Sequence, residues 1–127
     1  MVSQFNLGLR MTQSEATSTS LDGQSPTPAT QIRNLIYEDE TGKLFGVLEI
    51  DGRFFIHSIL YAPEKLSVIK HYKNILHALE DQLRSRGVEK YYTMADSENG
   101  FRFNKLMGFE TNLEVWDDIY EVMVKEL

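Results

Sequence analysis

The sequence contains no cysteine among its 127 residues. Disulfides, thiolate metal sites and a cysteine nucleophile are therefore excluded, and the redox compartment stays unspecified. No apolar run approaches the roughly 20 residues that a membrane-spanning helix needs, and the N-terminal residues lack the apolar core of a signal peptide. Basic residues number 13 against 19 acids, which gives a formal net charge of -6. This balance argues against partners that need a basic face, namely nucleic acid and anionic membranes.

What is present has the composition of a globular protein. Hydrophobic residues make up 42% and charged residues 25% of the chain, which is an ordinary balance for one packed core. A chain of this length forms a single domain. We expect a protein without membrane association that is located in the cytoplasm.

The first part of the chain divides into a strand and a linker. Apolar residues alternate with polar ones from Gln4 to Met11, which predicts a short strand within residues 1–13. Residues 14–31 are mostly Ser, Thr, Gln, Gly and Pro, and they cannot bury enough apolar surface to offset their chain entropy. We predict that they form a flexible linker, or are ordered only by another chain. The core domain is then residues 32–127.

The core begins with a β-meander. Strands are predicted over 32–37, 44–50 and 53–61, with Asp51-Gly52 as a two-residue hairpin turn in which both positions take positive φ. The third strand is apolar on both faces, which is typical of a strand in the middle of a helix-covered sheet.

Two helices and three more strands follow. A long helix is predicted over 63–86, with Pro63 in its first turn and Gly87 as its stop. Its apolar stripe recurs at steps of three and four, at Leu66, Ile69, Tyr72, Leu76, Leu79 and Leu83. A short helix is predicted over 97–107, ending at Gly108 in positive φ. Strands are predicted over 88–94, 110–116 and 119–126.

Two segments carry a family resemblance. The residues Arg86-Gly87-Val88 before a strand, and Arg102-Phe103-Asn104-Lys105-Leu106-Met107-Gly108-Phe109-Glu110 after it, resemble the last half of the GNAT superfamily of acetyl-CoA-dependent N-acetyltransferases. The resemblance runs from about Ile32 to the C-terminus. It implies an α/β fold with a mixed, mostly antiparallel sheet flanked by one long and one short helix. The first two helices of the family have no counterpart in the linker sequence, and in the family they wall the acceptor-substrate side.

The resemblance also identifies where acetyl-CoA would bind. In the family, a glycine-rich turn at the start of the long helix lets backbone N–H groups hold the pyrophosphate. The matching window here, Ser67–Tyr72, contains no glycine, and Lys70 and Tyr72 would stand where the phosphates approach. We interpret this as loss of the pyrophosphate-binding turn. Two alternatives stay open for the charges nearby, namely anion binding by side chains or a solvated helix face; these side chains are Lys65, Lys70, His71 and Lys73.

The resemblance leaves few candidates for chemistry. Many family members carry a tyrosine general acid four residues before the helix-ending glycine, and Asn104 occupies that position here. Asparagine does not titrate, so it can hydrogen-bond but cannot deliver a proton. An asparagine that helps hold the pantetheine arm is replaced by Ser97, which also suits a helix cap. Tyr61 and Ser67 complete the candidates for coenzyme binding.

A base for an amine substrate could come from the meander. The candidates are Glu49, His57 and Tyr61. We expect His57 to be a hydrogen-bonded core residue and Glu49 to be solvated beside its hairpin. No group of His, Asp and Glu has metal-ligand spacing.

These observations favour a non-catalytic GNAT-like protein that has lost acetyl-CoA binding and acts as a structural or protein-interaction module. Its expected partner is another protein or a second copy of itself, and no cofactor is expected. The sequence around Arg102-Phe103 is also similar to the small GNAT-like internal virion proteins of short-tailed phages, which would place the protein in a virion. The alternative is a divergent acetyl-CoA-dependent N-acetyltransferase, with acetyl-CoA as its cofactor.

Overall fold

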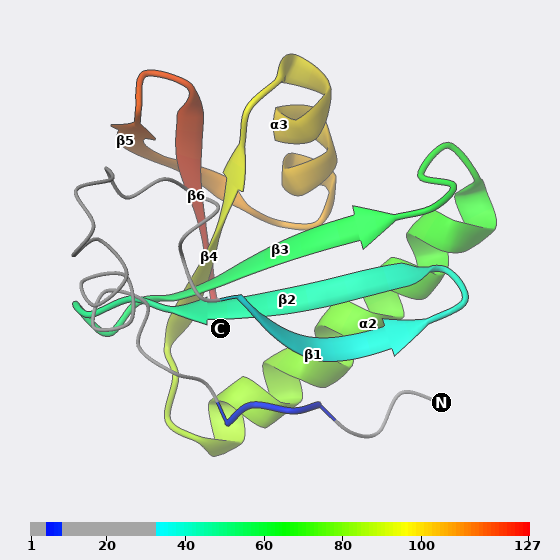
Figure 1. Ribbon diagram of the computed structural model, residues 1–127, viewed down its shortest axis with the longest axis horizontal. Helices are drawn as coiled ribbons and strands as arrows, with labels where there is room; N and C mark the ends of the chain where they lie inside the picture. Colours follow the sequence, from blue (N-terminus) through cyan, green and yellow to red (C-terminus); the bar gives the residue numbers. More distant parts are fainter. Residues whose placement is uncertain (1–4, 9–32) are drawn as a thin grey trace, which may run out of the picture. The chain divides into compact units, whose positions relative to one another are not determined.

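The computed structural model describes residues 5–8 and 33–127 of the chain (Figure 1). The described residues form six strands and two helices, and the sheet is mostly antiparallel, with antiparallel pairing of β1 with β2, β4 with β6 and β5 with β6. The elements in chain order are β1 (Asn34–Asp39), β2 (Gly42–Leu48), β3 (Phe54–Leu60), α2 (Leu66–Ser85), β4 (Lys90–Ala95), α3 (Glu98–Leu106), β5 (Glu110–Trp116) and β6 (Tyr120–Glu126). The predicted α/β class, with one long and one short helix, is confirmed.

Several predictions for the start of the chain fall outside the described residues. They concern the linker at 14–31, the missing family helices, and most of the strand predicted over 4–11. The four described residues of that strand, 5–8, belong to no β-ladder. They still contact β1, because the Asn6 N–H donates to the Ile36 carbonyl at 3.0 Å and the Phe5 ring lies 5.3 Å from that of Tyr37.

The chain divides into two compact units, and the first contains residues 5–59. Its strands follow the order β1-β2-β3, and β1 pairs with β2 from Asn34↔Gly46 to Asp39↔Gly42. The turn between these two strands is held by Asp39, whose carboxylate accepts from the Thr41 N–H at 2.8 Å. Side chains buried in this unit are Ile36, Leu44, Val47, Phe54, Phe55 and Ile56.

The turn before β3 differs from the predicted two-residue hairpin. Gly52 takes positive φ (+90°), but Asp51 does not, and the Gly52 N–H donates to the Glu49 carbonyl at 2.9 Å. The Glu49 N–H in turn donates to the Arg53 carbonyl at 2.9 Å. This is a three-residue loop with glycine at its left-handed position, so only the glycine needs conformational freedom.

The prediction that β3 is buried on both faces is confirmed only for its first half. Phe54, Phe55 and Ile56 are buried in succession, whereas His57 is exposed and Ile59 is 43% exposed. The expectation that His57 is a core residue was therefore wrong. Its apolar neighbours in the sequence gave no sign that burial stops halfway along the strand.

The second unit contains residues 60–127, with both helices. Helix α2 begins at Leu66, three residues later than predicted, because the Lys65 N–H still closes a turn onto the Ala62 carbonyl at 3.1 Å. Leu66 is 65% exposed and lies outside the apolar stripe, where sequence spacing had placed it. The residues of α2 that are buried are Val68, Tyr72, Ile75, Leu76, Leu79, Glu80 and Leu83.

The strands of the second unit follow the order β4-β6-β5, and β6 pairs antiparallel with both neighbours. Tyr91, Phe109, Val122 and Met123 are buried almost completely in this unit, and the Tyr91 and Phe109 rings meet edge to face at 5.1 Å. Helix α3 ends as predicted, with Gly108 at φ +102°.

No helix among the described residues is both long enough and apolar enough to cross a membrane.

Candidate functional site

The start of α2 is where the sequence resemblance would put a coenzyme pyrophosphate. Lys65 is the N-cap residue, and its side chain makes no capping hydrogen bond. Its carbonyl accepts from the N–H groups of Val68 and Ile69, each at 3.1 Å, and the Ile69 bond is the regular helical bond to the carbonyl four residues earlier. Of the first four N–H groups, which lack such a partner, that of Lys65 donates to the Ala62 carbonyl and that of Val68 to the Lys65 carbonyl, so fewer N–H groups remain for a phosphate.

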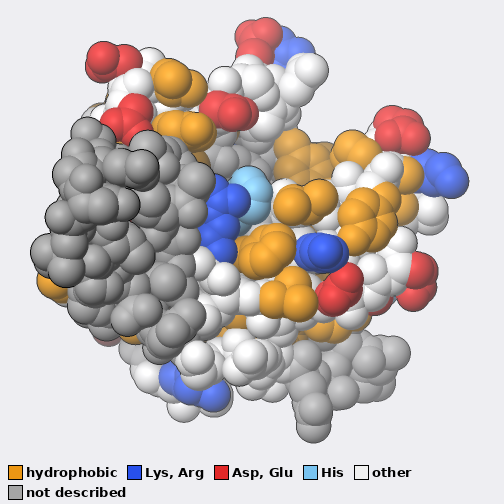
Figure 2. All heavy atoms as spheres, viewed as in Figure 1, with side chains coloured by type: hydrophobic (Ala, Val, Ile, Leu, Met, Phe, Trp, Pro, Cys, Tyr) orange, Lys and Arg blue, Asp and Glu red, His pale blue; other side chains and the backbone are white. Residues whose placement is uncertain are grey.

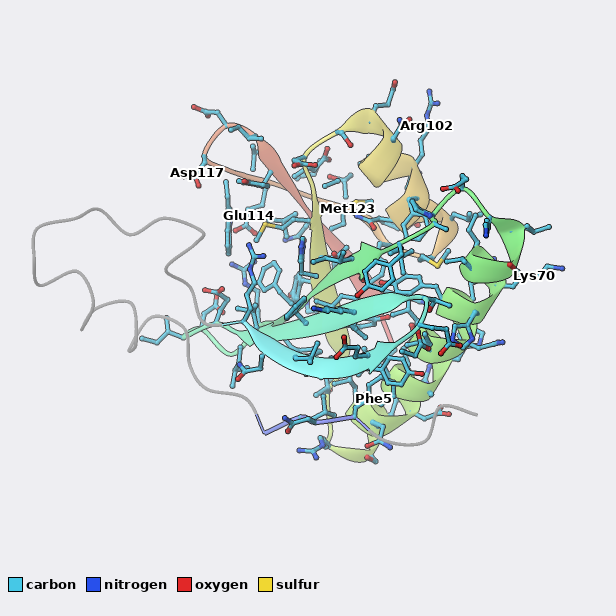
Figure 3. The ribbon with its side chains drawn as sticks, turned by 45° about the vertical axis from the view of Figure 1, so that its right-hand side comes forward. Phe5, Lys70, Arg102, Glu114, Asp117 and Met123 are labelled. Carbon is cyan, nitrogen blue, oxygen red and sulfur yellow. The ribbon has the colours of Figure 1, made fainter. Side chains whose placement is uncertain are left out.

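The window Ser67–Tyr72 lies wholly inside α2. Backbone N–H groups beyond the first helical turn point along the helix axis to carbonyls four residues earlier, so they cannot line a loop. Ser67 and Lys70 are exposed, and Lys70 projects from the helix (Figure 3). Lys65 and Lys73 are also exposed.

Tyr72 is only 5% exposed, and its ring packs at 5.6 Å from that of Phe103 in α3. This contact joins the two helices of the unit. The side chain therefore belongs to the core, in agreement with its place in the predicted apolar stripe, and it is not directed to a ligand.

Asn104, at the position of the general acid in the family, is used to hold α3 in place. Its Nδ2 donates to the Met94 carbonyl of β4 at 3.2 Å and approaches the Met123 sulfur of β6 at 3.5 Å. Ser97 is the N-cap of α3, and its hydroxyl oxygen accepts from the Gly100 N–H at 3.0 Å. Both side chains thus make structural hydrogen bonds.

The base candidates are spread over the two units. Glu49 and His57 belong to the first unit, whereas Tyr61 belongs to the second and is 56% exposed. Glu49 is 7% exposed, so the expectation that it would be solvated was wrong. The His57 ring lies 6.4 Å from the Phe45 ring. Among the described residues, no group of three or more His, Asp and Glu could hold a metal ion.

A buried polar cluster that the sequence interpretation missed lies between α2, β4 and β6. The Glu80 carboxylate accepts from the Tyr91 hydroxyl at 2.6 Å and pairs with the Lys125 ammonium at 2.6 Å. Lys125 also donates to the Met107 carbonyl at 2.8 Å, which satisfies the C-terminal end of α3. Burial, together with the Glu80 carboxylate, raises the pKa of Tyr91 far above its ordinary value. The available signal was an acid directly after Leu79, on the apolar face of α2.

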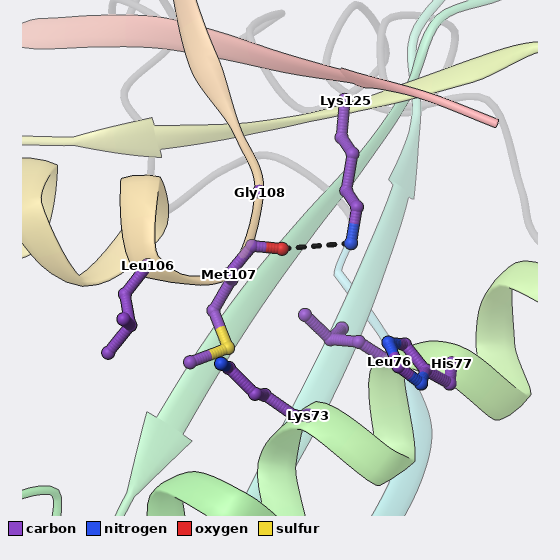
Figure 4. Close-up of a pocket in the computed structure, with 7 residues that line it drawn as sticks. All are labelled: Lys73, Leu76, His77, Leu106, Met107, Gly108 and Lys125. Carbon is purple, nitrogen blue, oxygen red and sulfur yellow. Dashed lines mark hydrogen bonds between the residues drawn. The ribbon is translucent and has the colours of Figure 1, made fainter.

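Beside this cluster is a pocket of about 210 Å³ (Figure 4). Its lining comes from α2, from the end of α3 and from β6, through Lys73, Leu76, His77, Leu106, Met107, Gly108 and Lys125. This volume is below the roughly 300–1,000 Å³ of typical small-molecule sites. The charge of Lys125 is already engaged by Glu80, and Lys73 and His77 are the other basic side chains of the lining.

Comparison with known proteins adds a structural neighbour. No family model and no curated protein matches the sequence. The crystal structure of a protein described as "putative acetyltransferase from Agrobacterium tumefaciens" is similar to this structure with a TM-score of 0.49 and 20% sequence identity. The similarity covers 76% of this chain and 74% of that chain.

Proposed function

We propose that this protein is a GNAT-like domain that does not bind acetyl-CoA or transfer acetyl groups, and that acts through protein–protein contacts. The observation that carries the proposal is the start of α2. There the Lys65 and Val68 N–H groups already donate to the Ala62 and Lys65 carbonyls, and the expected phosphate window continues as helix. Phosphate capture by a helix N-terminus depends on several free N–H groups at short range.

The role of Asn104 supports the same proposal. An amide side chain that holds α3 against the Met94 carbonyl has no proton to give to a departing thiolate. Replacing it by a tyrosine would cost that hydrogen bond. The residues at the positions that are functional in the GNAT superfamily therefore stabilise the fold here. We infer that the function depends on the protein surface instead.

The setting of this role is proposed from the sequence. It is the cytoplasm or, following the resemblance around Arg102-Phe103, the interior of a virion. Phe103 packs on Tyr72, whereas Arg102 is exposed on α3 beside Glu98 (Figure 3). If the protein is a virion component, mass spectrometry of purified particles of the encoding phage will detect it.

Acetyl-CoA binding is tested by thermal unfolding of the protein with and without about 1 mM acetyl-CoA. A ligand at 100 times its Kd stabilises the folded state by about 2.7 kcal/mol, so even a Kd near 10 μM would raise Tm by several degrees. We expect no change in Tm and no acetyl transfer.

A saturable rise in Tm would overturn the proposal. The variant Lys70→Ala then reports whether side chains near the start of α2 hold the coenzyme, with Lys90→Ala as its control, because Lys90 is an exposed lysine on β4. Loss of the shift in the first variant but not in the second would favour a divergent acetyltransferase that binds the phosphates through side chains.

A further inference from the structure

Three large apolar side chains are exposed on the β5–β6 hairpin. Leu113 is 90% exposed, and Val115 and Ile119 are each 59% exposed. We refer to these three residues as the hairpin surface. Among the described residues, no other large hydrophobic side chain is as exposed as Leu113. Clusters of exposed apolar side chains with polar surroundings mark interaction sites more often than isolated ones do.

The backbone of the hairpin places Leu113 outward. The pairing of β5 with β6 shifts register between Thr111 and Glu114, and within this bulge Leu113 takes a left-handed conformation with φ +58°. The bulge is held from inside, because the Leu113 N–H donates to the Thr111 hydroxyl oxygen at 3.2 Å and that hydroxyl donates to the Glu121 carboxylate. A left-handed conformation is unfavourable for leucine, and display of its side chain to water gains nothing for the isolated fold.

The hairpin also carries most of the net charge of the protein. Residues 110–126 contain six acids and one lysine, so their formal charge is -5, against -6 for the whole chain. The one lysine, Lys125, pairs with the buried Glu80. At the tip, Asp117 and Asp118 are exposed, and neither forms a salt bridge with a described residue. Acidic and hydrophobic side chains lie next to one another over this hairpin (Figure 2).

The charge decides which occupant fits the hairpin surface. An anionic membrane or a nucleic acid would be repelled by a formal charge of -5. A second copy would bring the same acids against these, which is unfavourable. A metal ion is not favoured, since the described residues contain no cluster of three or more metal-binding side chains.

We propose that the β5–β6 hairpin is the docking surface for a cationic, amphipathic segment of a partner protein. Apolar side chains of that segment cover Leu113, Val115 and Ile119, and its lysines or arginines lie against the acids around them. This inference rests on the proposed interaction role and names the chemistry of the partner.

The test measures binding of a fluorescein-labelled peptide of alternating lysine and leucine to the full chain by fluorescence anisotropy. Counterpart peptides replace every lysine by glutamate or every leucine by serine. We expect saturable binding of the lysine–leucine peptide alone, weakening as salt screens the acids. Leu113→Asn should weaken it about tenfold through lost apolar contact. The double variant Asp117→Asn/Asp118→Asn keeps the turn shape and should weaken it about threefold.

Matched controls lie outside the hairpin. Ile50→Asn removes an apolar side chain that is 58% exposed in the first unit, and Glu64→Gln/Glu89→Gln removes two exposed charges. Neither should change the affinity for the peptide. Should Leu113→Asn fail to fold by circular dichroism, Ile119→Asn serves as the apolar variant.

Absence of peptide binding, or binding that the hairpin variants leave unchanged, would overturn the inference. A dimer in sedimentation that Leu113→Asn dissolves would also overturn it, in favour of a second copy as the occupant. These outcomes can be told apart from a failure of the proposed loss of acetyl-CoA binding, which would appear as a rise in Tm with acetyl-CoA or as acetyl transfer.

Discussion

The interior of the second unit and its β5–β6 hairpin differ in how well each residue suits its surroundings and its backbone conformation. In the interior, each polar group of the Glu80–Tyr91–Lys125 cluster has a partner within 2.8 Å, and the backbone position with φ +102° is occupied by Gly108. In the hairpin, left-handed positions are occupied by a leucine and two aspartates, with φ between +55° and +58°.

This contrast separates the interior residues that specify the fold from the hairpin residues that are available for function. Agreement between local preference and packing stabilises one structure, and departures from it tend to gather at functional surfaces. Among the described residues, the non-glycine residues with positive φ, the most exposed large apolar side chain and most of the net charge all fall on this one hairpin. We therefore expect the interior to lose stability when the Glu80–Tyr91–Lys125 cluster is broken. We expect the hairpin to gain stability when a residue with an unfavourable backbone conformation is replaced.

The largest effect is expected for Glu80→Ala. The substitution leaves the Lys125 ammonium and the Tyr91 hydroxyl without their buried partner, and loss of one member of a buried ion pair costs about 3–5 kcal/mol. Urea unfolding measures the change in the free energy of unfolding. Asp81→Ala is the control, because Asp81 pairs with Arg84 at the surface and such pairs contribute about 0–1 kcal/mol. Equal effects of the two variants would mean that the cluster is solvated.

The second prediction concerns alkaline pH. The pKa of Tyr91 in the folded protein is raised above its ordinary value of 10, so its contribution to stability is complete below pH 10 and is lost as the pH rises further. In the pH range where a tyrosine is ionised in the unfolded chain but still protonated in the folded protein, it lowers the free energy of unfolding by about 1.4 kcal/mol per pH unit.

Tyr37 provides the comparison for this pH dependence. Partial burial and the nearby Asp39 raise the pKa of Tyr37 to about 12, so its contribution should end near that pH. Urea unfolding from about pH 9 to about pH 12 should therefore give a shallower slope for either Tyr91→Phe or Tyr37→Phe than for the wild type. An unchanged slope in Tyr91→Phe would contradict the burial of this hydroxyl.

The sequence predicted the elements well because their signals are local. The strand over 110–116 and the short helix, capped by Ser97 and ended by Gly108, agree with the structure. The start of α2 was predicted three residues early, since Pro63 suits both a first helical turn and the turn that it occupies here.

Burial of polar residues was predicted less well because it depends on contacts distant in sequence. Glu49 is buried and His57 is exposed, the reverse of what their neighbours indicated. Glu80 is held by Tyr91 and Lys125, and no spacing rule relates residues 11 and 45 positions away. Leu113 was counted as part of an ordinary strand, since the sequence carries no glycine to mark its bulge.

The third prediction concerns Gly108. Alanine there would be strained at φ +102°, and its Cβ would lie 2.8 Å from Cε of Lys125. We expect Gly108→Ala to lower the free energy of unfolding by about 1–2 kcal/mol. Gly87→Ala is the control, because Gly87 has φ +81° but open space around it, so it reports backbone strain alone. An equal loss at Gly87 and Gly108 would show that the Lys125 side chain moves aside without cost.

The smallest effect, and the only gain, is expected from Leu113→Asn. Asparagine tolerates the left-handed region better than leucine does, and the leucine side chain that it replaces is 90% exposed. The substitution should therefore raise the free energy of unfolding by about 0.5–1 kcal/mol.

Val115→Asn is the matched control for that gain. Val115 lies on the same strand, is 59% exposed and has no left-handed backbone. Asparagine there should cost about 0.5–1 kcal/mol, because β-branched residues suit strands and asparagine does not. Opposite signs at the two positions would locate the strain at Leu113 itself. If both variants lose stability, the side chain of Leu113 contributes to the fold. The interpretation that the hairpin, unlike the interior, gives up stability for binding would then lose the residue that supports it most.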